Sequence, residues 1–274
     1  MISLLLEMLS YDFLMRALLV GALVALVSSL LGVTLVLKRY SMIGDGLSHV
    51  AFGAMSIALA LNIAPLYIAL PACVIAAFFL LKLSENSKLK GDSAIALVAS
   101  SSLALGVIAT SLSSGLSVDV YGYMFGSILA MQKSDVYISV VLCVVVCAVF
   151  ILCYNKIFAL TFDSNFAKAT GMKTNLYNML IAALTALTIV IGMRIMGTML
   201  ISSLIIFPAL TSMRLFKSFK GVVISSSVVS VVCFFFGVFF SYLFSIPTGA
   251  SVVAVNLIVY LVFIFIGYIH TKKA

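Results

Sequence analysis

Long apolar runs separated by short polar connections follow one another along the whole chain. They cover about residues 13–37, 41–62, 64–82, 93–112, 135–154, 176–193, 197–213, 221–243 and 249–269. An α-helix rises about 1.5 Å per residue, so roughly 20 apolar residues cross the ~30 Å hydrocarbon core of a bilayer. Most runs have this length, although 197–213 is short and 41–62 is interrupted by polar residues. The pattern predicts nine membrane-spanning helices, or eight if one run is re-entrant.

The same pattern indicates the fold class. Membrane β-barrels are built from short segments of alternating polarity, whereas these runs are continuously apolar. Glu7 and Asp12 precede a first run that is longer than the apolar part of a signal peptide, so this run predicts a spanning helix. We therefore expect an all-α integral membrane protein with one transmembrane domain over residues 1–274.

Composition and charge support this prediction and add an orientation. The chain is 64% hydrophobic and 9% charged, whereas soluble domains are about 25% charged. Of the 16 basic residues, 13 fall in alternate connections or the C-terminal tail, namely Lys38, Arg39, Lys82, Lys88, Lys90, Lys156, Lys168, Lys173, Arg214, Lys217, Lys220, Lys272 and Lys273. Because basic residues favour the cytoplasmic side, nine spans predict an outer N-terminus and an inner C-terminus.

Two ionisable side chains interrupt the second run, within the stretch GDGLSHVAFGA at residues 44–54. Asp45 and His49 are four positions apart, which places them on one face of a helix. His49 follows Arg39 by ten residues, or roughly 15 Å, which is near the middle of the bilayer. A carboxylate at membrane depth costs several kcal/mol unless water, a partner or a cation faces it.

This pair suits a transition metal ion. Carboxylate oxygen and neutral imidazole are ligands for Zn²⁺ and for Mn²⁺. One chain offers too few ligands for a tight site, but a two-fold homodimer would supply four around its axis. In a second interpretation, Asp45 lies at the inner interface and bonds backbone or a lysine, while His49 bonds a neighbouring carbonyl; spacing alone does not separate the two.

The inner connection at residues 161–175 predicts a second functional element. Asp163 is placed to cap a short helix that runs to Gly171, with Phe166 and Ala167 on its apolar side. This segment is either an ordinary surface loop or a docking helix for a cytoplasmic partner. The outer connection at 113–133 is semi-apolar and is predicted to contain a short interfacial or re-entrant helix.

The short seventh run places three further candidates together, Ser202, Ser203 and Pro208. Pro208 is expected to kink its helix and free a carbonyl near residue 204. A packing kink and a contact with a transported ion both fit this pattern. The chain has no phosphate-binding loop of the type G-x-x-x-x-G-K-[ST], so ATP hydrolysis would require another subunit.

Taken together, these motifs resemble the membrane permease of bacterial zinc/manganese-uptake ABC transporters. The resemblance spans nearly the whole chain and is carried by GDGLSHVAFGA, by VDVYGYMFGSILA (118–130), by FDSNFAKATGM (162–172), by the block at 186–216 and by PTGASVV (247–253). It implies a metal-type ABC importer permease fold, Asp45 and His49 on the translocation path, and a coupling loop from Asp163 to Gly171.

The resemblance also implies partners and a location. These are a second permease, cytoplasmic ATP-binding subunits and an extracytoplasmic metal-binding protein, in the bacterial cytoplasmic membrane. It implies Zn²⁺, or alternatively Mn²⁺ or Fe²⁺, as transported substrate, with no resident cofactor. This chain has Ser127 where many relatives have an acidic residue, which does not support an outer metal contact there. A secondary transporter or channel is the alternative from another class, although no internal repeat supports it.

Overall fold

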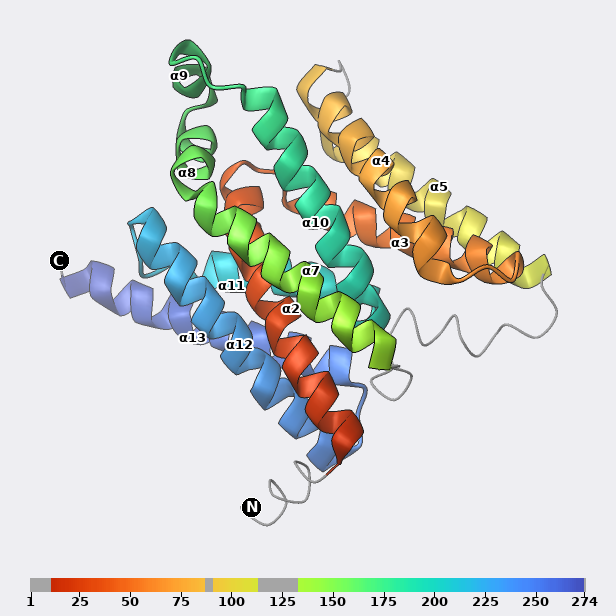
Figure 1. Ribbon diagram of the computed structural model, residues 1–274. Coiled ribbons are helices and arrows are strands. Elements are labelled where there is room, and N and C mark those ends of the chain that lie inside the picture. The colour runs from red at the N-terminus through yellow and green to blue at the C-terminus, as the bar shows by residue number, and fades with distance from the viewer. Residues whose placement is uncertain (1–10, 87–90, 113–132, 274) are drawn as a thin grey trace.

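The computed structural model describes residues 11–86, 91–112 and 133–273, and regular structure within these ranges is helical (Figure 1). The helices are α2 (Asp12–Leu37), α3 (Ser41–Ala60), α4 (Pro65–Asn86), α5 (Gly91–Leu112), α7 (Lys133–Leu152), α8 (Tyr154–Phe162), α9 (Ser164–Ala169), α10 (Thr174–Met196), α11 (Thr198–Ser212), α12 (Phe219–Phe244) and α13 (Thr248–Lys273).

The predicted all-α membrane fold is confirmed. In the described residues, seven helices are long and apolar enough to cross a membrane, and an eighth span results if the bent pair α7–α8 counts as one. This pair bends by 69°. The predicted run 197–213 forms the short helix α11, of 15 residues. The predicted outer segment at 113–133 and Ser127 lie outside the described residues except for Lys133, the first residue of α7.

Helix α3 lies at the centre of one half of the molecule. It packs against α4, α5, α10 and α11, whereas α2 packs mainly against α11, α12, α10 and α7. Figure 1 shows α10 running between α4 and the group of helices around α2, so α10 joins the two halves. The mean hydropathy of the α3 span is 1.3, below the 2.0 to 2.6 of the other single-helix spans, which fits its buried position among helices.

Two glycines allow the backbones of α3 and α2 to lie close to neighbouring helices. A Cβ atom on Gly53 would lie 2.4 Å from the backbone oxygen of Ser102 on α5. A Cβ atom on Gly32 would lie 2.0 Å from the backbone oxygen of Ile205 on α11. Small residues allow such close backbone approach, which is how membrane helices gain packing contacts in an apolar solvent.

The turn between α2 and α3 is short and fully hydrogen-bonded. Arg39 adopts a left-handed conformation with φ of 61°. Its N–H donates to the carbonyl of Val36 at 3.0 Å, and the N–H of Tyr40 donates to the carbonyl of Leu35 at 2.7 Å. This is the bond pattern of a Schellman motif, which normally has glycine at the left-handed position. The turn therefore fixes where α3 begins relative to the end of α2.

Candidate metal site

Asp45 and His49 lie one turn apart on α3, as the spacing predicts. His49 Nε2 is 3.7 Å from Asp45 Oδ2. The two side chains are 31% and 43% exposed for His49 and Asp45, while most of the residues around them on α3 are buried. A single copy of the chain therefore presents an imidazole and a carboxylate together on an accessible face of an otherwise buried helix.

Neighbouring helices flank this face on both sides. Ser48 Oγ lies 3.2 Å from Ser202 Oγ of α11, and a Cβ atom on Gly44 would lie 3.3 Å from the Ile205 side chain. On the other side, a Cβ atom on Gly46 would lie 2.6 Å from the Ile95 side chain of α5. Asp45 and His49 thus lie on the strip of α3 between its contact with α11 and its contact with α5.

The described part of one chain holds no cluster of three or more His, Cys, Asp or Glu side chains that could bind a metal. Asp45 and His49 together offer one carboxylate and one imidazole, two kinds of side chain that can bind a metal ion. The sequence also allowed an ion pair between Asp45 and a lysine. Within the described residues, the ion-pair contact of Asp45 is with His49. Both side chains keep enough exposure to reach ligands from a second molecule.

The inner connection forms the short helix that its sequence predicts. The Asp163 carboxylate accepts a hydrogen bond from the backbone N–H of Phe166 at 2.8 Å and caps α9. The helix ends before Gly171, whose φ is 82°. Ala167 is fully buried, whereas Phe166 is 63% exposed, so the two side chains expected on the apolar side of this helix differ in burial.

The three candidates on α11 separate in the structure. Ser202 reaches α3 through Ser48 and also lies 3.3 Å from the carbonyl of Thr198. Ser203 donates to the carbonyl of Leu200 at 2.8 Å, within its own helix. Helix α11 continues through Pro208 as far as Ser212, so the proline does not end it. Of the three, Ser202 is the residue with a hydrogen bond to α3, through Ser48, the residue before His49.

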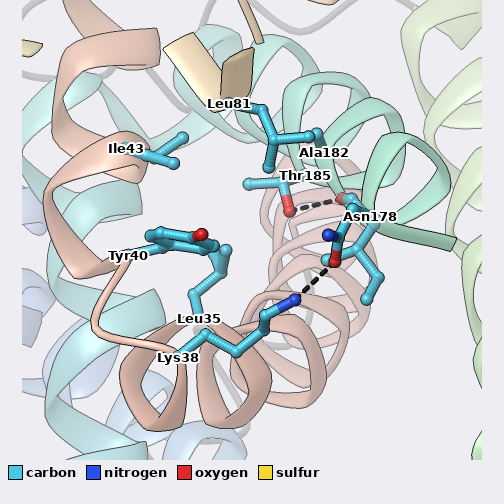
Figure 2. Close-up of a pocket in the computed structure, with 9 residues that line it drawn as sticks. Leu35, Lys38, Tyr40, Ile43, Leu81, Asn178, Ala182 and Thr185 are labelled. Atoms are coloured by element: carbon cyan, nitrogen blue, oxygen red, sulfur yellow. Dashed lines mark hydrogen bonds between the residues drawn. The ribbon is translucent and has the colours of Figure 1, made fainter. Parts of the chain in front are cut away.

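Sequence reasoning missed a polar contact on the far side of α3. Lys38 Nζ donates a hydrogen bond to Asn178 Oδ1 across 140 positions of sequence. Figure 2 shows this bond at one side of a small pocket between α2, α3, α4 and α10, lined by Leu35, Lys38, Tyr40, Ile43, Leu81, Asn178, Ile181, Ala182 and Thr185. Lys38 counted only as one inner basic residue in the sequence, and nothing in the spacing singled out Asn178.

Comparison with known proteins gives consistent relatives over almost the whole chain. The model of the ABC 3 transport family matches residues 10–267. The manganese import system permease protein ScaB of Streptococcus gordonii is 32% identical over 257 residues, covering 94% of this chain and 92% of that protein. The probable iron transport system membrane protein of Haemophilus influenzae is 31% identical over 263 residues, covering 96% and 93%.

A solved structure has the same arrangement of helices. It is described as PsaBC from Streptococcus pneumoniae in complex with Fab, and the compared chain is 29% identical. The TM-score is 0.86, and the match covers 96% of this chain and 95% of the other.

Proposed function

Because the chain belongs to the ABC 3 transport family, we propose that Asp45 and His49 bind the divalent metal ion that it carries across the membrane. The chain is a multi-pass membrane protein and the permease subunit of a metal importer. Such a subunit is not itself an enzyme, and ATP is hydrolysed by another subunit of the transporter. The chain forms one transmembrane domain over residues 1–274, with residues 161–175 as its coupling segment.

One observation carries this assignment. The carboxylate of Asp45 and the imidazole of His49 lie together and half-exposed on the least apolar single-helix span, which other helices otherwise bury. Ionisable groups at membrane depth usually mark an ion path, because they are costly there without a functional partner. A site with few ligands from each chain binds an ion and still releases it, as transport requires.

We propose manganese as the metal, with zinc as the second candidate. Several relatives are named for manganese import, including the protein from S. gordonii and one from Listeria monocytogenes, while the relative from H. influenzae is named for iron. Carboxylate and imidazole ligands accept Mn²⁺. Zinc, which the resemblance to the family implied first, gains support from ligand number, since two copies would together offer two Asp and two His, and Zn²⁺ prefers four ligands of such types. The metal is substrate, and no resident cofactor is required.

The proposal includes three kinds of partner. A second copy of the chain would complete the ligand set around Asp45 and His49. Cytoplasmic ATP-binding subunits would dock on the segment around Asp163 and Gly171, which α9 presents at the inner end of α10. An extracytoplasmic metal-binding protein would deliver the ion from the other side of the membrane.

The test is total cellular manganese, zinc and iron, measured by mass spectrometry in a deletion strain grown under metal limitation. The strain is complemented with the wild type, with His49→Ala or with Met42→Ala. Met42 is the matched control, because it is 48% exposed on α3, about one turn before Asp45 and two turns before His49, and has no ionisable side chain. We expect one metal to fall in the deletion and to recover with the wild type and Met42→Ala, but not with His49→Ala.

The outcomes separate the parts of the proposal. A fall in zinc alone would keep the site and change the substrate from manganese to zinc. Full recovery with a membrane-inserted His49→Ala protein would contradict the assignment of the metal ligands. No change in any of the three metals in the deletion strain would contradict metal import as the function.

A further inference from the structure

The contact between Lys38 and Asn178 joins two segments whose roles are otherwise separate. Lys38 is the C-terminal cap of α2, and three residues later α3 begins with Ser41. Asn178 lies near the start of α10, the helix that follows the proposed coupling segment. The hydrogen bond from Lys38 Nζ to Asn178 Oδ1 therefore connects the start of the metal-binding helix to the end of the coupling segment (Figure 2).

The connection from Lys38 to α3 is stiff. The Schellman bonds of Arg39 and Tyr40 hold the turn, and Lys38 Nζ also lies 5.6 Å from the centre of the Tyr40 ring. With so few residues between α2 and α3, a displacement of Lys38 displaces the first turn of α3. Asp45 follows that turn on the same helix.

The connection from Asn178 back to the coupling segment is equally short. Helix α9 ends at Ala169 and α10 begins at Thr174, with Gly171 at φ of 82° between them. The N–H of Met172 donates to the carbonyl of Ala167 at 3.0 Å, which closes this turn as well. Movement of α9 therefore reaches the first turns of α10 through a hydrogen-bonded connection, with Asn178 four residues into the helix.

The surrounding contacts between α10 and α3 are apolar and differ in kind from this bond. Ile43 of α3 and Ile181 and Ala182 of α10 line the same pocket. Apolar contact is non-directional, so packed helices slide along one another at low cost. A hydrogen bond from an ammonium to a carbonyl oxygen is directional and strong, because its donor is charged. It resists that sliding and fixes the register of α10 against the α2–α3 turn.

We propose that the Lys38–Asn178 hydrogen bond transmits movement of the coupling segment to α3, and so to Asp45 and His49. Both residues act as positioning residues and bind no metal themselves. The inference rests on the proposed function, since it requires residues 161–175 to contact the ATP-binding subunit. On this mechanism, a transporter without the bond still hydrolyses ATP, but less of the movement of its ATP-binding subunits reaches α3.

The test uses the assembled transporter, purified with its ATP-binding subunit and reconstituted into liposomes. Metal uptake and ATP hydrolysis are measured together in the wild type, Lys38→Met, Asn178→Leu and Asn178→Asp. Asn178→Asp keeps a carbonyl-type acceptor for Lys38 and is the conservative variant. Lys82→Met is the matched control, because Lys82 is an exposed lysine near the inner end of α4.

We expect Lys38→Met and Asn178→Leu to lower the metal transported per ATP hydrolysed by about fivefold or more, the lower end of typical coupling between two sites. ATP hydrolysis and equilibrium binding of the metal alone should stay within about twofold of the wild type, which is below that range. Asn178→Asp and Lys82→Met should keep the wild-type ratio.

An unchanged ratio in assembled Lys38→Met and Asn178→Leu would overturn the inference. A lowered ratio in Asn178→Asp equal to that in Asn178→Leu would overturn it as well, since the acceptor is kept. If one of the two apolar variants does not assemble, the comparison of Asn178→Asp with the other apolar variant still decides the matter. Failure of the wild-type complex to import any metal would instead contradict the proposed function.

Discussion

The hydroxyl of Ser48 on α3 lies 3.2 Å from the hydroxyl of Ser202 on α11, and His49 is the next residue along α3. Ser48 also donates to the carbonyl of Gly44 at 2.9 Å, so its hydroxyl has a hydrogen bond within α3 while it contacts α11. The contact joins the short helix α11 to α3, the helix that carries Asp45 and His49. It therefore helps to set how far the Asp45 and His49 face lies from α11.

A double-mutant cycle measures this contact. Ser48→Ala, Ser202→Ala and the double variant should show a coupling free energy of about 0.6 kcal/mol, the average for hydrogen bonds between membrane helices. The measurement is the free energy of unfolding in detergent. Ser203→Ala replaces Ser202→Ala in the control cycle, because Ser203 bonds within its own helix, and its coupling to Ser48→Ala should be near zero. Equal coupling in the two cycles would show that the Ser48–Ser202 contact contributes nothing specific.

Replacement of Gly53 by alanine should destabilise the protein. The new Cβ atom would lie 2.4 Å from the Ser102 backbone oxygen. The backbone of α5 cannot relieve this contact by a rotamer change, as a flexible side chain could. Overpacking of this kind costs about 1–3 kcal/mol. The thermal unfolding temperature in detergent should fall, and metal uptake should fall with it.

Gly267→Ala provides the matched control for this change. Gly267 is also in a helix, but its Cβ atom would lie 3.5 Å from the Arg214 carbonyl oxygen, an ordinary contact. There the higher helix propensity of alanine, up to about 1 kcal/mol, should act alone and leave the protein equally or more stable. The same unfolding temperature for both variants would contradict the close packing of α3 on α5.

Removal of the α9 cap should weaken coupling to ATP hydrolysis. Asp163→Ala deletes the acceptor for the N–H of Phe166 and costs about 0.5–2 kcal/mol of helix stability, whereas Asp163→Ser keeps an acceptor at the same position. We expect Asp163→Ala to lower the metal transported per ATP hydrolysed and Asp163→Ser to keep it. If both variants transport like the wild type, the helix between Asp163 and Gly171 is not the coupling element.

The helices were predictable from the sequence because spanning a bilayer imposes long apolar runs. The run at 41–62 predicted α3 at Ser41–Ala60, and the run at 93–112 predicted α5 at Gly91–Leu112. The run at 135–154 did not show the bend before α8, because apolar residues continue through it and no proline or glycine marks the break.

The candidate site was predictable only in part. Asp45 and His49 were found because i, i+4 spacing on a helix fixes their proximity without tertiary information. The contact of Lys38 with Asn178 depends on how α2 and α10 pack, which local pattern does not encode. The pattern also did not show that Phe166 and Ala167 differ in burial, because α9 packs Ala167 against the rest of the chain and leaves Phe166 exposed.

The last prediction concerns Arg39, which adopts φ of 61° in the turn before α3. Left-handed conformations cost L-residues about 1–2 kcal/mol, asparagine adopts them more readily, and β-branched residues adopt them least. Arg39→Asn and Arg39→Val remove the same charge, so their difference isolates the backbone. We expect Arg39→Val to be less stable to unfolding than Arg39→Asn by about 1–2 kcal/mol.

The same pair of variants reports on the site. If the turn positions α3, the strain in Arg39→Val should also weaken metal binding by Asp45 and His49, which are held one and two turns into that helix. The measurement is equilibrium binding of Mn²⁺ or Zn²⁺ to the purified complex, with Arg39→Asn as the reference. Equal affinity and equal stability in the two variants would mean that the left-handed residue is not what sets the position of α3, and that the packing of α3 against α4, α5 and α11 suffices.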